Sequence, residues 1–358
     1  MEKIFLDILR PDDWHVHLRE GEILSSVLPF TYENFRSALI MPNLDTPITS
    51  ISLAENYYNE ICKQIPRGIE FTPNMTLYLT NDLSKNEIEK VSNHEYIKAI
   101  KMYPKGATTN SGSGISDFKD FYHLFEVMEE SGVILSIHGE VTDEKVDVFE
   151  RESVFIEKVL TKIIKQFPSL KIVLEHITSA DAVKFINDQS MVAATITVHH
   201  LMVNRNIMLS KGIRPDFYCA PILKTEYDRR ALVQAAISGN RKFFLGTDSA
   251  PHVEGKKIAS CGCAGIFSSP FAIPLLIQLF EEHSSLKKIE PFVSRNGRAF
   301  YGVRQHKDRV RYVKRPKSIE VIKDIKTSNG KIKVFNPHSD IYWEKENYYN
   351  FVRKNENK

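Results

Sequence analysis

The feature that most constrains the fold is a regular alternation of short apolar runs with longer amphipathic ones. Eight runs are rich in Ile, Val, Leu or Phe and do not alternate strictly with polar residues, as expected for strands covered on both faces. They span residues 14–18, 37–41, 70–78, 96–102, 133–138, 171–176, 192–197 and 242–247. Helical patterns lie between them, at 52–65, 84–91, 117–130, 151–166, 179–188, 225–237, 269–282 and 288–300. This order indicates an α/β protein, and eight strands favour a TIM-like (β/α)8 barrel over an open sheet.

Two helix boundaries have specific signals. Ser84 precedes a helical pattern and Glu87 follows three residues later, which predicts a capping box. Gly132 comes directly after the apolar stripe of the 117–130 helix, so we expect this helix to stop there.

The amino-acid composition changes near residue 304, where basic residues become frequent. We therefore predict a barrel over residues 1–303 and a small C-terminal extension, residues 304–358, packed on it. The start of this extension is basic, and a nucleic-acid patch and a solvated basic edge are both open interpretations, of which we favour the second. Its basic residues are Arg304, Lys307, Arg309, Arg311, Lys314, Arg315 and Lys317.

Composition excludes several classes of protein. The 48 Lys and Arg residues exceed the 45 Asp and Glu by only 3, so net charge indicates no polyanionic partner. Four cysteines in 358 residues are too few for a disulfide scaffold. No apolar run approaches the roughly 20 residues of a membrane span, and the N-terminal stretch carries acidic residues where a signal peptide is apolar. We expect a cytoplasmic protein with no membrane or nucleic-acid partner.

Polar residues fall where the predicted strands end, which is where a barrel of this kind carries its chemistry. His15 and His17 share one face of a strand and can bind one ion, although a His-x-His pair alone is also found near ordinary turns. The other strand ends favour the metal interpretation. They contain Arg19, Asn43, Lys101, Tyr103, His138, Glu140, Glu175, His176 and Asp248.

His138 and His176 each close an apolar run, at equivalent positions of successive strands. One such histidine is usually a core residue with its hydrogen bonds satisfied, but two neighbours in space favour a second ion. Asp248 follows another apolar run, and a buried unpaired carboxylate there is costly. The alternative for Asp248 is the N-cap of the next segment.

Lys101 ends a strand where a cation between metal ions would be repelled. It either extends to solvent or substrate, or it is carbamylated by carbon dioxide on the neutral amine. Carbamylation converts the cation into a carboxylate that can bridge two ions.

Several sequence blocks, in order and from about residue 12 to 301, resemble the class II, single-function bacterial dihydroorotases of the amidohydrolase superfamily. Residues 197–200, Thr-Val-His-His, depart from the family's usual Thr-Pro-Gln-His, so His199 inherits no role. The blocks are His15-Val-His-Leu-Arg19, Met41-Pro-Asn43, Lys101-Met-Tyr-Pro104, Ala107-Thr-Thr-Asn110, His138-Gly-Glu-Val141, Glu175-His-Ile-Thr178, His200-Leu-Met202, Gly246-Thr-Asp-Ser-Ala-Pro-His252 and Ser260-Cys-Gly-Cys-Ala-Gly265.

The resemblance implies two Zn²⁺ ions per chain and a homodimer. One zinc would be held by His15, His17 and Asp248, and the other by His138 and His176. N6-carboxylated Lys101 and a hydroxide would bridge the two ions.

The reaction implied is the reversible conversion of N-carbamoyl-L-aspartate to L-dihydroorotate, with Asp248 as general acid and base. Arg19, whose planar fork matches a carboxylate, would bind the substrate's free carboxylate with Asn43 and His252. A surface salt bridge is the alternative for Arg19. The main chain at Ala220 and Ala264 would read the ring amides, and Thr108 and Thr109 would lie on a Gly/Ser/Thr-rich loop that closes over the substrate.

Two other functions fit parts of the pattern. Another cyclic amidase, such as a hydantoinase or allantoinase, would keep the metal site but not need Arg19. A catalytically inactive barrel could act as a scaffold for a partner enzyme. The Cys261-Gly-Cys263 spacing is a weak metal signal, and we expect none of the four cysteines to bind a metal.

Overall fold

The computed structural model describes residues 4–346 and contains an eight-stranded parallel sheet in the order β2 to β9. The sequence-based prediction of a TIM-like barrel is confirmed. β2 has the predicted length but lies two residues earlier than predicted, and the other seven strands are slightly shorter than predicted. The strands are β2 (Asp12–Val16), β3 (Ser37–Ile40), β4 (Thr72–Tyr78), β5 (Ile97–Met102), β6 (Ile134–Ile137), β7 (Ile172–Leu174), β8 (Val192–Ile196) and β9 (Phe243–Leu245).

The barrel closes between its first and last strands through the residues that follow β9. The Asp248 amide donates to the His15 carbonyl at 2.8 Å, and the His17 amide donates to the Ser249 carbonyl at 3.0 Å. This seam therefore brings three predicted metal ligands from opposite ends of the barrel sequence to one place.

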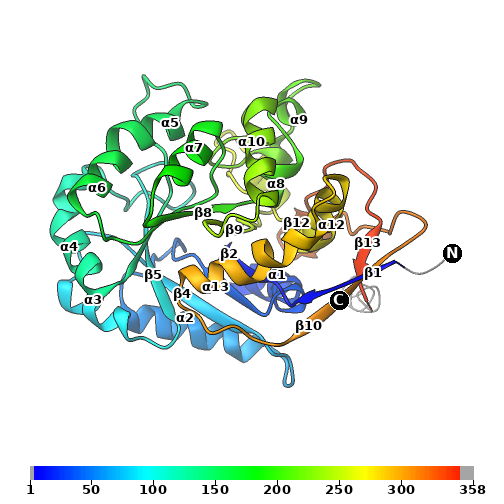
Figure 1. Cartoon of the computed structure of the whole chain (residues 1–358), viewed down its shortest axis with the longest axis horizontal. Helices are drawn as coiled ribbons and strands as arrows, with labels where there is room; N and C mark the ends of the chain where they lie inside the picture. The colour runs from blue at the N-terminus through cyan, green and yellow to red at the C-terminus, as the bar shows by residue number, and fades with distance from the viewer. Residues whose placement is uncertain (1–3, 347–358) are drawn as a thin grey trace.

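Helices cover the outside of the barrel (Figure 1). A single turn of π-helix, Ile156–Leu160, joins α5 and α6 into the continuous helix predicted at 151–166. The helices are α1 (Gly21–Asn34), α2 (Ile51–Gln64), α3 (Lys85–Ser92), α4 (Tyr122–Ser131), α5 (Arg151–Phe155), α6 (Thr161–Gln166), α7 (Ala180–Asp188), α8 (Val198–Met202), α9 (Asn206–Leu209), α10 (Glu226–Ile237), α11 (Glu254–Lys257), α12 (Ala272–Glu282) and α13 (Asn296–Phe300).

One of the two boundary signals is confirmed and the other holds in part. Gly132 ends α4 with φ +72°, as expected. Ser84 caps α3 by accepting from the Glu87 amide at 3.2 Å, but the Glu87 carboxylate accepts from the Ile51 amide, so the capping box is only half formed. The helices predicted at 117–130 and 288–300 include a 3₁₀ turn, Phe118–Phe121, and a π turn, Pro291–Arg295, respectively. The sequence analysis assigned no helix at α1, which contains Pro29 and buries residues around most of its circumference. It therefore lacks the polar–apolar stripe that identifies a surface helix.

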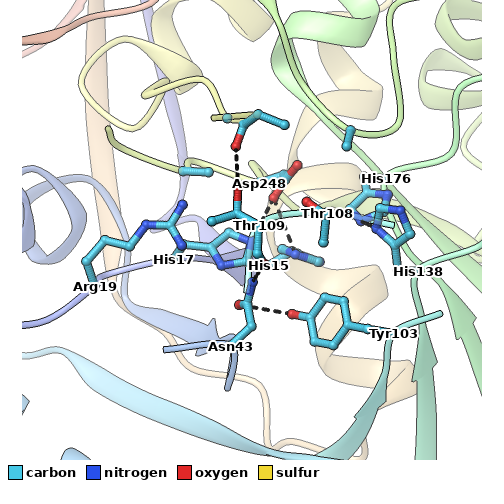
Figure 2. Close-up of a pocket in the computed structure, with 14 residues that line it drawn as sticks. His15, His17, Arg19, Asn43, Tyr103, Thr108, Thr109, His138, His176 and Asp248 are labelled. Atoms are coloured by element: carbon cyan, nitrogen blue, oxygen red, sulfur yellow. Dashed lines mark hydrogen bonds and ion pairs between the residues drawn. The ribbon is translucent and has the colours of Figure 1, made fainter. Parts of the chain in front are cut away.

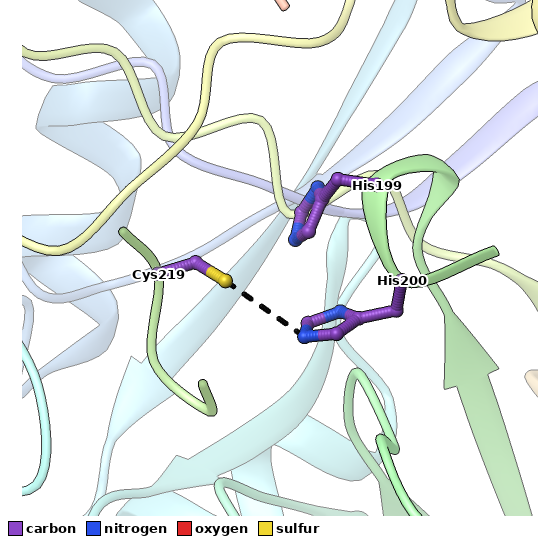
Figure 3. A group of neighbouring side chains, drawn as sticks. All are labelled: His199, His200 and Cys219. Carbon is purple, nitrogen blue, oxygen red and sulfur yellow. Dashed lines mark hydrogen bonds between the residues drawn. The ribbon is translucent and has the colours of Figure 1, made fainter. Parts of the chain in front are cut away.

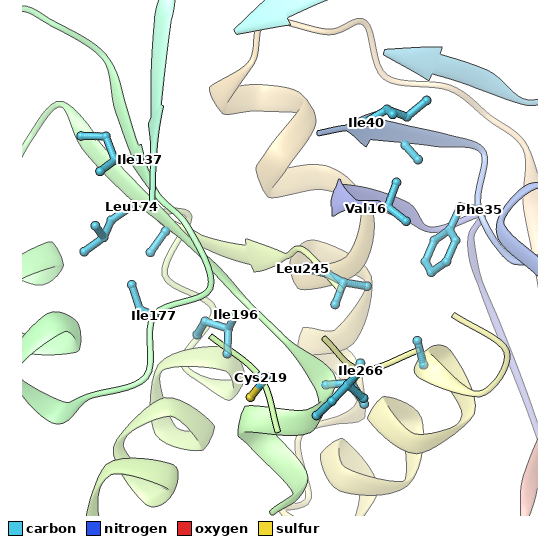
Figure 4. Close-up of a cluster of buried hydrophobic side chains, with 14 of the residues drawn as sticks. Val16, Phe35, Ile40, Ile137, Leu174, Ile177, Ile196, Cys219, Leu245 and Ile266 are labelled. Carbon is cyan, nitrogen blue, oxygen red and sulfur yellow. The ribbon is translucent and has the colours of Figure 1, made fainter. Parts of the chain in front are cut away.

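One hydrophobic cluster fills the interior of the barrel, and a larger one lies between the strands and the surrounding helices. Inside the barrel, Trp14 stacks on Tyr301 with ring centroids 4.5 Å apart, and alternate strand residues such as Leu39 and Val173 pack around them. Residues on the other strand face, among them Val16, Ile40, Ile137, Leu174, Ile196 and Leu245, belong to the larger cluster that also includes the helices (Figure 4). The inner cluster closes the barrel interior, so chemistry is confined to the opposite, carboxyl ends of the strands.

A second sheet joins the two ends of the described chain. It consists of β1 (Phe5–Leu9), β10 (Arg309–Lys314) and β13 (Trp343–Lys345), all antiparallel, and lies to one side of the barrel (Figure 1). A separate hairpin is formed by β11 (Asp324–Thr327) and β12 (Gly330–Lys333). The last part of the predicted extension, 347–358, lies outside the described residues.

Part of the basic 304–317 run is held by acidic partners. Arg311 pairs with Asp7 across β1 and β10 at 2.8 Å, and Lys314 pairs with Glu281 at 2.8 Å. Arg309 pairs with Glu290 at 3.0 Å. These contacts tie the extension to the N-terminal strand and to the barrel helices. Of the helices in residues 4–346, none combines the length and the apolar character needed to cross a bilayer.

Candidate active site

One pocket at the carboxyl ends of the strands gathers most of the predicted site residues (Figure 2). About 320 Å³ of space not filled by protein atoms, part of it open to solvent, lies in this pocket. Every predicted site residue lines it except Lys101, which is buried beside it, and His252, which contacts the lining residue Arg19. The lining residues are His15, His17, Arg19, Asn43, Tyr103, Thr108, Thr109, His138, His176, Ala220, Asp248, Ala250, Ala264 and Gly265.

The first group of donor atoms lies at the seam of the barrel. Asp248 Oδ1 is 3.0 Å from His17 Nε2 and 3.4 Å from His15 Nε2. Burial lowers the pKa of both imidazoles, which favours the neutral form that binds metals. These three side chains form a candidate metal-binding group.

The second group follows β6 and β7. His138 Nδ1 and His176 Nε2 face each other at 3.2 Å. Glu140 Oε2 lies 2.9 Å from His138 Nε2 and accepts its proton there, which leaves the Nδ1 lone pair directed into the pocket. Without an ion, one of these two nitrogens must carry a proton, because two lone pairs at this distance repel each other. If both lone pairs are free, the two nitrogens can bind the same cation.

Lys101 is completely buried at the end of β5. Its Nζ lies 5.0 Å from the Tyr103 ring centre and makes no hydrogen bond within the described part of the chain. Burial lowers its pKa to about 8, against the opposing charges of Glu175 and Asp248. A buried ammonium without a partner is costly, so the site favours a neutral or modified amine.

Two carboxylates that the sequence analysis left without a role orient the histidines. Glu175 Oε2 accepts from His15 Nδ1 at 2.9 Å, and Ser136 and Thr195 also donate to this carboxylate at 2.6 Å each. Burial raises the pKa of Glu175, but the charge of His15 and its hydrogen bond outweigh this effect and bring that pKa below its usual value. The signal was present in the sequence, because Glu175 is an acid at the end of an apolar strand.

Asp13 is the second of these carboxylates. It accepts from the Thr247 amide at 2.8 Å and from the Thr247 hydroxyl at 2.6 Å, and so joins β2 to the segment after β9. Burial raises its pKa to about 7. It fixes the spacing between His15 and Asp248.

Three site residues have the left-handed backbone conformation that non-glycine residues rarely adopt: Arg19 at φ +60°, His176 at φ +39° and Asp248 at φ +47°. Each follows the end of a barrel strand. Such conformations persist where the surrounding structure imposes them, and they cluster at active sites.

Cationic and polar side chains form one wall of the pocket. Arg19 Nη2 lies 3.0 Å from His252 Nε2, and Arg19 Nε donates to the Pro251 carbonyl at 3.3 Å. The Tyr103 hydroxyl donates to Asn43 Oδ1 at 3.1 Å, which turns the Asn43 amide nitrogen toward the Thr109 carbonyl at 3.0 Å. This wall offers donors for an anion beside the imidazole groups.

The loop at 104–114 lies closed against the pocket. The Thr109 hydroxyl donates to the Ala264 carbonyl at 3.3 Å, and His252 Nε2 contacts the same carbonyl at 3.0 Å. Gly114 allows this arrangement, because a Cβ there would lie 2.5 Å from the Tyr103 carbonyl oxygen. The loop and the Ala264 segment therefore meet over the site.

The donor set suits borderline divalent metals. Imidazole nitrogens and carboxylate oxygens are the usual zinc ligands, and His15 Nε2 and Lys101 Nζ are buried without hydrogen-bond partners in residues 4–346. A centre of this kind activates water for attack on an amide or ester carbonyl.

Comparison with known proteins agrees with this chemistry. Residues 12–312 match the amidohydrolase family. A dihydroorotase from Alcanivorax borkumensis is 46% identical over 89% of this chain and 93% of its own length. A dihydroorotase from Shewanella baltica is 50% identical over 87% of this chain and 91% of its own. The crystal structure of Saccharomyces cerevisiae dihydroorotase with 5-fluoroorotic acid superposes with a TM-score of 0.87 at 35% identity, covering 95% of this chain and 98% of that one.

The fold and the site define a hydrolase of the cyclic-amide type, and the chain belongs to the amidohydrolase family. The dihydroorotases named above, which are among its relatives, match it over more than nine-tenths of their own length.

Proposed function

We propose that this protein interconverts N-carbamoyl-L-aspartate and L-dihydroorotate, the ring-closing step of de novo pyrimidine synthesis. The observation that carries the proposal is that one pocket contains both a cluster of metal-binding imidazoles and a wall of donors for a carboxylate. The dihydroorotases at 45–50% identity, and a fold relative that binds 5-fluoroorotic acid, support this choice of ring.

The residues present fit two zinc ions. His15, His17 and Asp248 would hold one ion and His138 and His176 the other, with carboxylated Lys101 between them. The unpartnered Lys101 Nζ and His15 Nε2, and the facing nitrogens of His138 and His176, support this assignment. Zinc bound there would lower the pKa of water to about 7 and polarise the amide carbonyl.

Asp248 would move the proton in both directions. In ring opening its carboxylate accepts a proton from the attacking water and delivers it to the leaving ring nitrogen. In ring closure it takes the proton from the carbamoyl nitrogen and returns it to the departing oxygen. The contact of Asp248 with His17 holds the carboxylate at the seam, where both transfers take place.

The substrate carboxylate would bind the wall formed by Arg19, Asn43 and His252. The Arg19 guanidinium presents two parallel donors, which match the two oxygens of a carboxylate. Asn43 donates one amide hydrogen to the Thr109 carbonyl, and the other would be donated to the substrate.

The remaining pocket residues would bind the ring and exclude water. The main chain of Ala220 and Ala264 would pair with the ring amides, and Thr108 and Thr109 would contact the substrate when the loop is closed. A lid of this kind keeps solvent from the reacting bond. The proposal includes a cytoplasmic homodimer, as in the family that the sequence resembles.

The test is a direct assay. Purified protein supplied with zinc and bicarbonate should consume L-dihydroorotate, measured as loss of the ring's ultraviolet absorbance. Hydantoin and dihydrouracil, cyclic amides without the carboxylate, serve as matched controls and should turn over far more slowly. Absence of turnover with all three rings would favour the inactive scaffold, and preference for a control ring would favour another cyclic amidase.

A further inference from the structure

A second cluster of candidate metal-binding side chains shares no residue with the proposed zinc pair. His199 and His200 are on the short helix α8, and Cys219 lies in the segment between α9 and α10. One donor atom from each lies within 4.8 Å of the others, and all three residues are buried. Figure 3 shows the two rings and the sulfur directed toward a common space.

His199 supplies an independent indication of a ligand. Its side chain is fully buried, yet neither ring nitrogen has a hydrogen-bond partner among the described residues. Its ring contacts are with His200, at 4.5 Å between centroids, and Phe335, at 6.2 Å. Because a buried imidazole without hydrogen bonds loses its hydration without compensation, a bound ion would account for this residue.

We propose that His199, His200 and Cys219 form a structural zinc site, separate from the catalytic centre. Two imidazoles and one thiolate are typical zinc ligands. Bond lengths of about 2.0–2.3 Å place tetrahedral ligand atoms roughly 3.3–3.6 Å apart. Cys219 Sγ is 3.8 Å from His200 Nε2, and the three donor atoms lie within 4.8 Å of one another, so the side chains would have to move closer to complete the site. This inference departs from our expectation that no cysteine binds a metal and that His199 has no role.

Metal binding would move two protons in a small hydrogen-bond network, one from Cys219 and one on His200. His200 Nε2 and the Cys219 thiol both donate to the Pro221 carbonyl, at 3.0 and 3.3 Å, and the Thr197 hydroxyl lies 2.8 Å from His200 Nδ1. On binding Zn²⁺, the thiol releases one proton to solvent. The His200 proton moves from Nε2 to Nδ1, where it is donated to Thr197. The Pro221 carbonyl oxygen is then free to take the fourth ligand position.

Two buried lysines, Lys224 and Lys257, lie near this cluster, and both donate to main-chain carbonyls, Lys224 to that of Ile222 at 3.4 Å. Lys257 donates to the carbonyls of Tyr218 and Gly265, at 2.9 and 2.5 Å, so its charge is directed to the main chain. The thiolate of Cys219 would offset the remaining repulsion.

The site would connect α8 to the wall of the catalytic pocket. Cys219 and Pro221 flank Ala220, a lining residue of that pocket. A metal held here would fix the Ala220 segment against α8. The inference does not depend on the reaction proposed above.

Cobalt provides a specific test because the proposed catalytic centre contains no sulfur. The holoenzyme is titrated with Co²⁺ under reducing, oxygen-free conditions, and near-ultraviolet thiolate-to-cobalt charge-transfer absorption is recorded. We expect one thiolate-bound cobalt per chain, displaced by Zn²⁺. Cys219→Ser and His199→Gln should each abolish the band, and zinc should raise the thermal unfolding midpoint of the wild type but not of His199→Gln.

Matched cysteine variants control for other thiols. Cys62→Ser and the double variant Cys261→Ser/Cys263→Ser should keep the band. The proposal is overturned if the wild type shows no band, or if the band survives in His199→Gln. Loss of the band in the double variant alone would also overturn it, because the thiolate would then lie elsewhere. His199→Gln keeps a side chain of similar size, so it remains informative if Cys219→Ser does not fold.

Discussion

Glu175 and His15 form a buried hydrogen bond of 2.9 Å between Oε2 and Nδ1, which directs the other imidazole nitrogen of His15 into the pocket. Neither side chain is more than 1% exposed. The bond fixes the tautomer as well as the orientation of the ring, since Nδ1 must carry the proton. Glu175 is therefore a positioning residue for the first group of donor atoms.

Glu175→Gln should weaken metal binding without removing a ligand. The amide retains an acceptor for His15 but loses the charge that makes the imidazole more basic, so we expect a roughly 10- to 100-fold loss of zinc affinity. Chelator competition measures this affinity directly.

Asp12→Asn is a matched control at the other end of the same strand. Asp12 is equally buried and pairs with Arg298 at 2.5 Å. Its loss should lower the free energy of unfolding by about 3–5 kcal/mol while the folded protein keeps its zinc affinity. Equal zinc affinity in Glu175→Gln and the wild type would contradict the positioning role.

Arg19→Met should reduce kcat/KM for L-dihydroorotate. Hydrogen bonds to charged groups contribute about 1.5–3 kcal/mol, which corresponds to roughly a 10- to 150-fold loss. The kcat/KM of Arg19→Lys should lie between those of Arg19→Met and the wild type, because lysine keeps the charge but not the planar fork. Steady-state kinetics on both variants decides this, and an unchanged kcat/KM in Arg19→Met would show that the substrate carboxylate binds elsewhere.

The sequence alone was enough to predict the barrel and the strand ends at which its polar side chains lie. Strand residues such as Leu39 and Ile40 are buried on both faces, and this produces the continuous apolar runs that identify a parallel sheet. His138 and His176 could be paired because successive parallel strands end at the same edge. These inferences needed only local periodicity and strand order.

Other features depend on contacts that local periodicity does not encode. The pairing of β1 with β10 joins Phe5 to Val313, and no nearby turn fixes this register. His200 and Cys219 meet only because the chain between α8 and α10, which includes α9, folds back. The role of Glu175 could not be predicted from the sequence, because it depends on the carboxylate accepting from three buried donors, one of which is His15 Nδ1.

Thr109→Val should loosen the closed loop. The variant keeps the shape of the side chain but loses the 3.3 Å hydrogen bond to the Ala264 carbonyl, worth about 0.5–1.5 kcal/mol. We expect up to roughly tenfold lower kcat with unchanged metal content, and faster cleavage by trypsin after the exposed Lys105 in the same loop. If the cleavage rate matched that of the wild type, the hydroxyl would not hold the loop.

Glu226 should stabilise the start of α10 in a pH-dependent way. Hydrogen bonds from Arg229, together with those from Asn204 and Arg230, lower the pKa of Glu226 to about 2. The pKa is lower in the folded state, so the stabilisation is complete above the unfolded value of about 4.5 and is lost as pH falls toward 2.

Glu226→Gln should therefore cost about 0.5–1 kcal/mol of unfolding free energy at pH 7, a modest value because the side chain is 39% exposed. The difference from the wild type should shrink between pH 5 and about pH 3, as measured by urea unfolding. Glu89→Gln, at an exposed position of α3, should show no such trend. A constant difference across this range would mean that the charge of Glu226 is not responsible.

The proposed carboxylation of Lys101 predicts a particular pH dependence of assembly. Carbon dioxide adds to the neutral amine, forming an N–C bond and releasing one proton. Because burial lowers the pKa of Lys101 to about 8, the reactive form increases as pH rises through that value. At a fixed concentration of dissolved carbon dioxide, apoprotein given zinc should regain activity faster at pH 9 than at pH 7, and faster with carbon dioxide than without.

Lys101→Ala should abolish activity, because the bridging carboxylate proposed above would be lost. Short carboxylates such as acetate or propionate should restore part of the rate, since they can occupy the space of the missing side chain. Lys98→Ala is the control on the same strand, where Nζ donates only to the Glu95 carbonyl in the described structure and the side chain is partly exposed. This control should keep its rate. A fully active Lys101→Ala protein without added carboxylate would mean that the amine neither bridges metals nor is modified.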